Sequence, residues 1–111
     1  MTPIQRQQRF SALLLQFREI LASAQKERPS RDGYKEVTIR GRTYQEPSWA
    51  VFEVETMLRA VNEVRVADGK PEATTDDLWR IEGYARGHSD YSLKFALYCA
   101  ELAIYGKVAC P

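Results

Sequence analysis

Apolar side chains recur every three or four residues over much of this chain, a spacing that is typical of amphipathic helices. The first such stretch predicts a long helix over residues 3–26, with Thr2 as its capping residue and Pro3 in its first turn. The proline and glycine within residues 28–33 are expected to end it. The apolar positions of this helix are Phe10, Leu13, Leu14, Phe17, Leu21 and Ala24.

Residues 34–46 follow an alternating pattern instead. Val37 and Ile39 fall on one side and Gly41 lies at the centre, so we predict a short β-hairpin. Because an isolated hairpin is marginally stable in water, the face that carries Val37, Ile39 and Tyr44 is expected to lie on the helices.

A second helical stripe of apolar residues begins after Pro47 and continues until Asp68. It predicts a helix with one buried face. The opposite side of this helix is expected to be polar and acidic, because it carries Glu53, Glu55 and Glu63.

A third, shorter helix is predicted after the loop at residues 70–74, and it ends at Gly87. Thr75, Asp76 and Asp77 place a hydrogen-bond acceptor and two carboxylates at its N-terminus, where they satisfy main-chain N–H groups and the helix dipole. We therefore interpret the two aspartates as capping residues rather than as a catalytic pair.

The fourth predicted helix covers residues 90–105, with Asp90 as its cap and Gly106 at its end. It is apolar almost all round, since Lys94 and Glu101 are its charged residues after the cap. Such a helix is either central in a bundle or shared with another chain.

Together these elements predict a mainly α fold, namely a four-helix domain with a small β-hairpin inserted between helices one and two. A length of 111 residues, of which 44% are hydrophobic, suits a single domain over residues 1–111 with its own core. No apolar stretch reaches the roughly 18 residues that a membrane span needs, so no membrane association is expected.

Charge is segregated along the chain. The formal net charge of +1 is too small to hold a polyanion through the overall field of the protein. Residues 26–42 nevertheless carry six basic and three acidic side chains, whereas residues 43–77 carry three and eight. This segregation indicates either pairing within the chain or two faces of opposite sign that are offered to partners.

Reactive chemistry is sparse in this sequence. Cys99 and Cys110 lack metal-ligand or redox spacing, and with no secretory signal they are expected to be reduced thiols in the cytoplasm. The nearest approach to a polar cluster is His88, Asp90 and Tyr91. We find no Glu-x-x-His pair, phosphate loop or nucleophile motif, and therefore expect no catalytic residue, no cofactor and no metal.

Basic and aromatic residues are interleaved in and before the predicted hairpin, and these residue types bind anions and stack on planar groups. Positive side chains on a hairpin can also protect its edges against aggregation. Trp49 and Trp79 belong to a residue type that dominates binding energy when it is exposed. The candidate partner-binding residues are Arg31, Tyr34, Lys35, Arg40, Arg42, Tyr44, Trp49 and Trp79.

Tyr84, Tyr91, Tyr98 and Tyr105 follow one another at intervals of seven, which can indicate a packed helical seam. Within one chain such a seam is core packing. Because tyrosine combines an apolar ring with a hydroxyl that tolerates water, it also suits a subunit interface. We therefore hypothesise a homodimer with Tyr91, Tyr98 and Tyr105 at its interface.

A rich inventory of aromatic and charged residues beside a poor catalytic one favours a non-enzymatic protein-interaction module with a protein partner. Small size and arginine-rich composition suggest a phage or mobile-element accessory protein that binds or inhibits a host protein. The alternative is a nucleic-acid-binding protein that uses the basic hairpin. A helix-turn-helix is disfavoured, because residues 90–105 offer apolar side chains where base-reading polar groups belong.

Overall fold

The structure, a computed structural model, describes residues 1–27 and 33–108. It confirms the predicted mainly α fold, with four helices and an antiparallel two-stranded hairpin between the first two. The segment that was expected to end the first helix falls largely on residues 28–32 and so lies outside the described residues. The elements are α1 (Pro3–Glu27), β1 (Tyr34–Ile39), β2 (Arg42–Pro47), α2 (Ser48–Ala67), α3 (Thr75–Arg86) and α4 (Tyr91–Tyr105).

Two helices begin with reciprocal capping. The hydroxyl of Thr2 accepts from the main-chain N–H of Gln5, and the Gln5 side chain accepts from the main-chain N–H of Thr2. Thr74 and Asp77 form the same arrangement at the start of α3. The prediction of Thr75 as the cap is therefore wrong by one position, because Asp77 stands three residues after Thr74 and so completes the capping box there.

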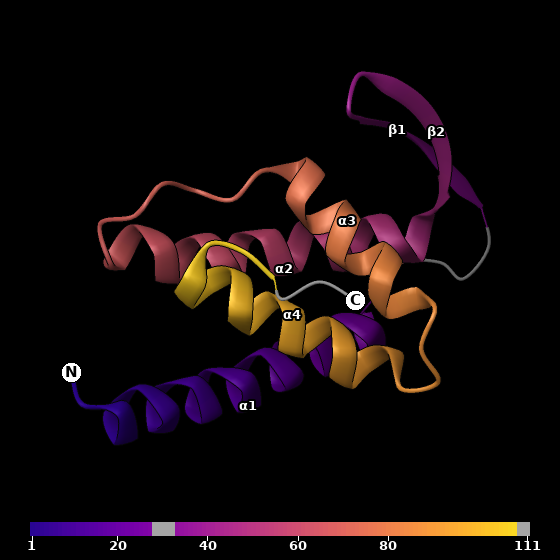
Figure 1. The fold of residues 1–111 in the computed structure, drawn as a ribbon. Coiled ribbons are helices and arrows are strands. Elements are labelled where there is room, and N and C mark those ends of the chain that lie inside the picture. The colour runs from indigo at the N-terminus through magenta and orange to yellow at the C-terminus, as the bar shows by residue number, and fades with distance from the viewer. Residues whose placement is uncertain (28–32, 109–111) are drawn as a thin grey trace.

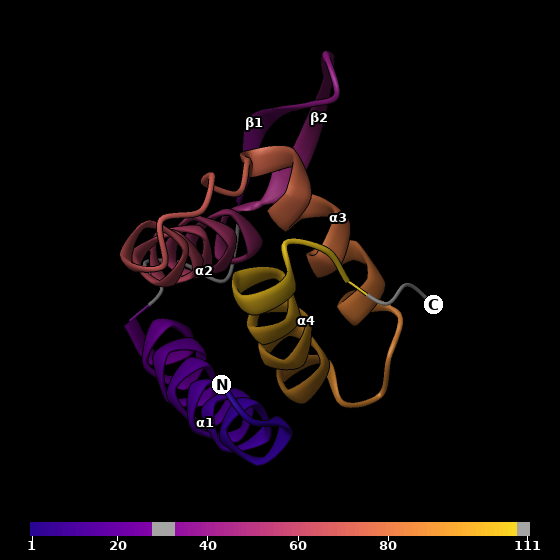
Figure 2. The same cartoon turned by 60° about the vertical axis from the view of Figure 1, so that its left-hand side comes forward.

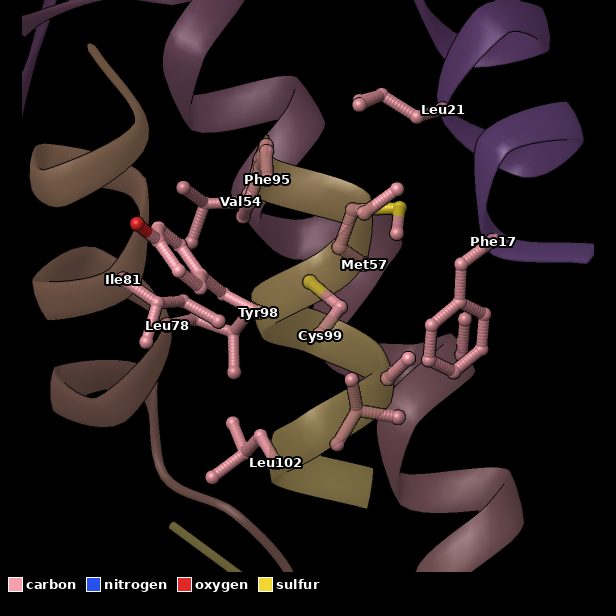
Figure 3. Close-up of a cluster of buried hydrophobic side chains, with 14 of the residues drawn as sticks. Phe17, Leu21, Val54, Met57, Leu78, Ile81, Phe95, Tyr98, Cys99 and Leu102 are labelled. Carbon is pink, nitrogen blue, oxygen red and sulfur yellow. The ribbon is translucent and has the colours of Figure 1, made fainter. Parts of the chain in front are cut away.

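The last helix, α4, lies at the centre of the bundle and contacts α1, α2 and α3, whereas α1 and α3 do not contact each other. Figures 1 and 2 show α4 between α1 and α3, with α2 running along the bundle beside them. In Figure 3, side chains of α1, α2 and α3 gather around Phe95, Cys99 and Leu102 of α4. This placement explains why α4 lacks a wide polar face.

A buried arginine ties the end of α2 to the end of α4. The guanidinium of Arg65 donates to the main-chain carbonyls of Pro71, Leu102 and Ala103. The last two carbonyls belong to the final turn of α4, where a positive charge is favourable, and the Leu102 carbonyl also accepts from the main-chain N–H of Gly106. Gly106 then leaves the helix in a left-handed conformation (φ 74°) against the same guanidinium.

The hairpin projects from the helical body beyond α2 and α3 (Figures 1 and 2). Of the described elements, it contacts α2 and α3. Val37 and Ile39 are half-buried against the core, as predicted. Tyr44 is 43% exposed, so the expectation that it packs on the helices is wrong. The physical reason is a cleft that lies between this part of the hairpin and α3.

Candidate partner-binding cleft

A cleft of about 450 Å³ separates the hairpin from α3. Ile39, Arg40, Tyr44 and Glu46 line it from the hairpin side, and α3 supplies the opposite wall. One wall of the cleft is therefore the hairpin, which the sequence indicated for partner binding. The other wall is α3, for which the sequence carried no such indication.

Antiparallel pairing decides which hairpin side chains face α3. Val37 pairs with Tyr44, and Ile39 pairs with Arg42. Directly paired residues lie on the same face of a sheet. Because Ile39 and Tyr44 line the cleft, Arg42 shares the face that is turned toward α3.

The tip of the hairpin is a two-residue turn, Arg40 and Gly41. Both residues have positive φ, 52° and 77° respectively, as a type I′ turn requires. Glycine adopts this conformation freely, but for arginine it costs about 1 kcal/mol. Asparagine or glycine would suit the first position better, so the arginine is not there for the sake of the turn.

A hydrogen bond holds this tip on α3. The main-chain N–H of Arg40 donates to Oδ1 of Asp76 at 3.1 Å. Asp76 lies in the first turn of α3, where its charge also favours the helix dipole. The cap itself is formed by Thr74 and Asp77, so the prediction of Asp76 as a capping residue is wrong. Its carboxylate accepts instead from the hairpin tip, 36 positions earlier in the chain.

Replacing Asp76 with alanine should loosen the hairpin, because the Arg40 N–H loses its acceptor. We expect a loss of about 1 kcal/mol in the free energy of unfolding. Hydrogen exchange measured by NMR should accelerate at the amides of residues 34–47 and stay slow in α4. The matched control is Asp77→Ala, which removes the α3 cap and leaves the tip contact intact. Equal acceleration of hairpin exchange in both variants would contradict this role of Asp76.

An ion network crosses from the hairpin to α3 along the cleft. The guanidinium of Arg86 donates to Glu82 at 2.8 and 3.1 Å and to Glu46 at 3.0 Å. The Glu82 side chain is 1% exposed, and burial raises its pKa despite the opposing attraction of Arg86. The charge of Glu82 in the folded protein therefore depends on Arg86.

Tyr91 extends the network to α2. Its hydroxyl lies 3.1 Å from Glu82 and 3.2 Å from Glu53, and burial beside these carboxylates raises the pKa of Tyr91, so the hydroxyl keeps its proton. Glu53 is fully buried. The prediction that Glu53 lies on the polar side of α2 is wrong, because Tyr91 and the other contacts of Glu53 satisfy its carboxylate inside the protein. Glu55 and Glu63 are exposed, as predicted.

Two arginines stand at the rim of the cleft, Arg40 on the hairpin and Arg80 on α3. Both are exposed. Within residues 1–27 and 33–108, neither guanidinium forms an ion pair with a carboxylate. The rim therefore presents positive charge to solvent.

The predicted partner-binding residues divide into an exposed and an interior group. Arg31 lies outside the described residues. Trp79 is 6% exposed and belongs to the core, although it also lines the cleft. Trp49 is half-buried, with the Arg86 guanidinium 5.6 Å from its ring centroid. The exposed members, all on the hairpin, are Tyr34, Lys35, Arg40, Arg42 and Tyr44.

The three tyrosines of the predicted homodimer interface are in different environments. Tyr98 is buried in the core and meets Tyr84 edge to face. Tyr91 is half-buried within the ion network, whereas Tyr105 is exposed and stacks on Phe10. Tyr105 is thus the member with surface to offer a second copy, and a homodimer stays a prediction.

The polar cluster named from the sequence does not converge on one point. His88 lies 3.4 Å from the hydroxyl of Tyr98, and Asp90 caps α4 by accepting from the main-chain N–H of Leu93. Tyr91 instead contacts the buried glutamates. Each of the three side chains therefore has a different neighbour.

Cys99 is fully buried and has a free thiol, whose pKa is raised by burial. Cys110 lies outside the described residues. In the part of the chain that the structure describes, no group of three or more His, Cys, Asp and Glu side chains is placed to hold a metal ion. The helices of that part include none with the length and apolar character of a membrane span.

Sequence reasoning missed the α3 wall of the cleft. Glu82 and Arg86 are four residues apart, a spacing at which opposite charges meet on a helix surface, and this signal was available. Asp76 and Arg80 have the same spacing, but no ion pair joins them in the described residues, and the place of Arg80 opposite the hairpin tip does not follow from the spacing.

Comparison with known proteins adds no relative: no protein-family model, no curated protein and no solved structure matches this chain.

Proposed function

We propose that this protein is a non-enzymatic interaction module that binds a protein partner at the cleft between the hairpin and α3. One observation carries the proposal: a projecting hairpin holds exposed arginine and tyrosine side chains over a cleft of about 450 Å³. Arginine and tyrosine are enriched among the residues that dominate the energy of protein interfaces. In the setting of a phage or mobile element, the partner would be a host protein that the module binds or inhibits.

The anchoring of the hairpin supports this role. The Asp76 contact at its tip and the Arg86 bridge at Glu46 fix the arm on α3 at two points. A surface that is held before binding loses less conformational entropy on association than a mobile one. The exposed side chains are thus presented on an ordered support.

Charge reversal at the hairpin tests the proposal. Arg40→Glu with Arg42→Glu should reduce capture of the partner from a lysate of the native cell by about tenfold or more, because two interface cations become anions. The fold should be retained, as judged by circular dichroism. Capture is quantified by mass spectrometry on the immobilised protein.

The matched control is Arg6→Glu with Arg18→Glu, which changes the net charge equally on the exposed surface of α1. It should leave the captured set unchanged. If capture of the partner falls equally in both double variants, or does not fall in the hairpin variant, the hairpin does not bind the partner.

Nucleic-acid binding is the second candidate, and the exposure of Tyr34 (70%) beside basic residues of the hairpin favours it. Glu36, Glu46 and Asp76 oppose it, because they add negative charge to the same region. Affinity for an oligonucleotide that falls steeply with salt would identify this function.

A further inference from the structure

We infer that the cleft binds a carboxylate-rich segment of the partner protein, with Arg40 and Arg80 as the side chains that recognise its carboxylates. This inference rests on the proposed function and specifies the chemistry of its partner.

The charge balance of the cleft carries the first step. The acidic side chains that line it are already engaged: Arg86 binds two of them, and Asp76 accepts from the main chain at the hairpin tip. Among the described residues, no carboxylate pairs with the guanidinium of Arg40 or Arg80. The lining holds three arginines and three carboxylates, so its formal charge is balanced, but the N–H donors of Arg40 and Arg80 have no carboxylate partner there. Complementarity therefore favours an occupant that places carboxylates at these two points.

The residue types at the mouth favour carboxylates. A guanidinium presents its N–H groups in a planar fork that matches a carboxylate with two parallel hydrogen bonds. Tyr44 and Tyr84 add aromatic surface to the walls of the same cleft. A Cβ placed on Gly83 would have no neighbour within 4 Å, so the main chain of α3 is open to an approaching segment at that point.

A protein segment suits this cleft better than a nucleic acid does. The phosphates of a nucleic acid form a continuous line of negative charge. Glu46 and Asp76 would lie beside such a line and repel it. A peptide can place its carboxylates opposite the two rim arginines and neutral residues elsewhere.

The backbone of Arg40 supplies an independent argument. Its φ of 52° is strained for arginine, and strain of this kind persists where function requires the side chain. The hydrogen bond to Asp76 uses the main-chain N–H, which asparagine would supply equally well. What the chain retains by keeping arginine at the tip is the guanidinium.

The test is an NMR titration of the full chain labelled with nitrogen-15. The probe is an acetylated and amidated octapeptide of alternating glutamate and valine, and the control peptide has glutamine in place of glutamate. The glutamate peptide should shift the amide of Gly83 and the side-chain N–H groups of Arg40 and Arg80. The glutamine peptide should shift them about tenfold less at equal concentration, because hydrogen bonds to charged groups are lost.

The decisive variant is Arg40→Asn. Asparagine relieves the strained turn, so the midpoint of thermal unfolding should rise, while affinity for the glutamate peptide should fall about tenfold. Arg80→Gln should weaken binding similarly without the gain in thermal midpoint. Exchange of Arg18, an exposed arginine on α1, for asparagine should leave the affinity unchanged.

Three outcomes would overturn the inference. They are the absence of shifts with the glutamate peptide, shifts confined to residues outside the cleft, and tighter binding of an oligothymidylate than of the peptide at about 50 mM salt. If one of these occurs while capture of the native partner still depends on Arg40 and Arg42, the proposed function stands and the carboxylate assignment fails. Loss of that dependence removes the proposed function itself.

Discussion

Replacing Arg86 with alanine should lower the free energy of unfolding by about 3 kcal/mol at neutral pH. The variant leaves the carboxylate of Glu82, which is 1% exposed, without its counterion. It also removes the bridge to Glu46 and the cation over the ring of Trp49. The expected loss is at the lower end of the range for breaking a buried pair, because 39% of the Arg86 side chain is exposed to solvent.

The loss of stability in Arg86→Ala should be larger at neutral pH than at mildly acidic pH. Burial raises the pKa of Glu82 above its ordinary value of 4.5, so the folded protein binds this proton more tightly than the unfolded chain does. Stability from this group therefore falls as the pH rises from 4.5 through the raised pKa. Because Arg86 lowers the pKa of Glu82, the replacement of Arg86 by alanine raises the pKa of Glu82 further. The deficit of Arg86→Ala should thus shrink between neutral pH and about pH 5.

A double-mutant cycle in urea makes this measurement specific to the pair. Glu82→Gln in the Arg86→Ala background should recover most of the loss at neutral pH, because the buried group no longer carries charge. A deficit that stays constant from neutral pH to about pH 5, or that glutamine fails to reduce, would show that Arg86 acts through packing alone.

Replacing Arg65 with methionine should also destabilise the protein by about 3 kcal/mol. Methionine keeps much of the side-chain volume but cannot donate to the carbonyls of Pro71, Leu102 and Ala103. Two of these carbonyls end the central helix, so each loses both a hydrogen bond and a favourable charge. Arg65→Lys should recover only part of the loss, because an ammonium lacks the planar fork.

The matched control for Arg65 is Lys70. Its ammonium donates to the carbonyl of Ile104 at 2.8 Å, in the same final turn of α4, but from a more exposed position. Lys70→Met should therefore cost about 1 kcal/mol. Urea unfolding followed by circular dichroism compares the two variants. Equal losses in both would mean that burial of Arg65 adds nothing to its capping of α4.

The helices could be read from the sequence because their signals are local. Phe17 and Leu21 fall on one face of α1 by spacing alone, and both are buried. The hairpin was also predictable, because an alternating segment with Gly41 at its centre indicates a tight turn. The cap of α3 was predicted at Thr75 instead of Thr74 because the two adjacent threonines have equal capping ability. Only the position of Asp77, three residues after Thr74, distinguishes them.

Interior polar contacts could not be predicted in this way. Glu53 lies on a helix face that reads as polar, yet Tyr91 and Gln25 reach its carboxylate from α4 and α1. These partners are 38 and 28 positions away, and no local pattern encodes such distances. The placement of Trp79 follows the same rule, since burial of a tryptophan depends on which helix packs over it.

The candidate site was half predictable for the same reason. The sequence indicated the basic and aromatic hairpin, because its residues are contiguous. The opposite wall requires knowing that the tip of the hairpin meets Asp76 at the start of α3. This contact, together with the Arg86 bridge to Glu46, places Arg80 in the same cleft as Arg40.

The central position of α4 has a consequence for biosynthesis. A ribosome makes this helix after the other three, so α1 and α3 emerge with α2 to pack on but without the central helix that each of them also contacts. The parts of their apolar faces that pack on α4 stay uncovered, or bound by a chaperone, until residues 91–105 leave the exit tunnel. Acquisition of native structure is thereby coupled to the final stage of translation of this region.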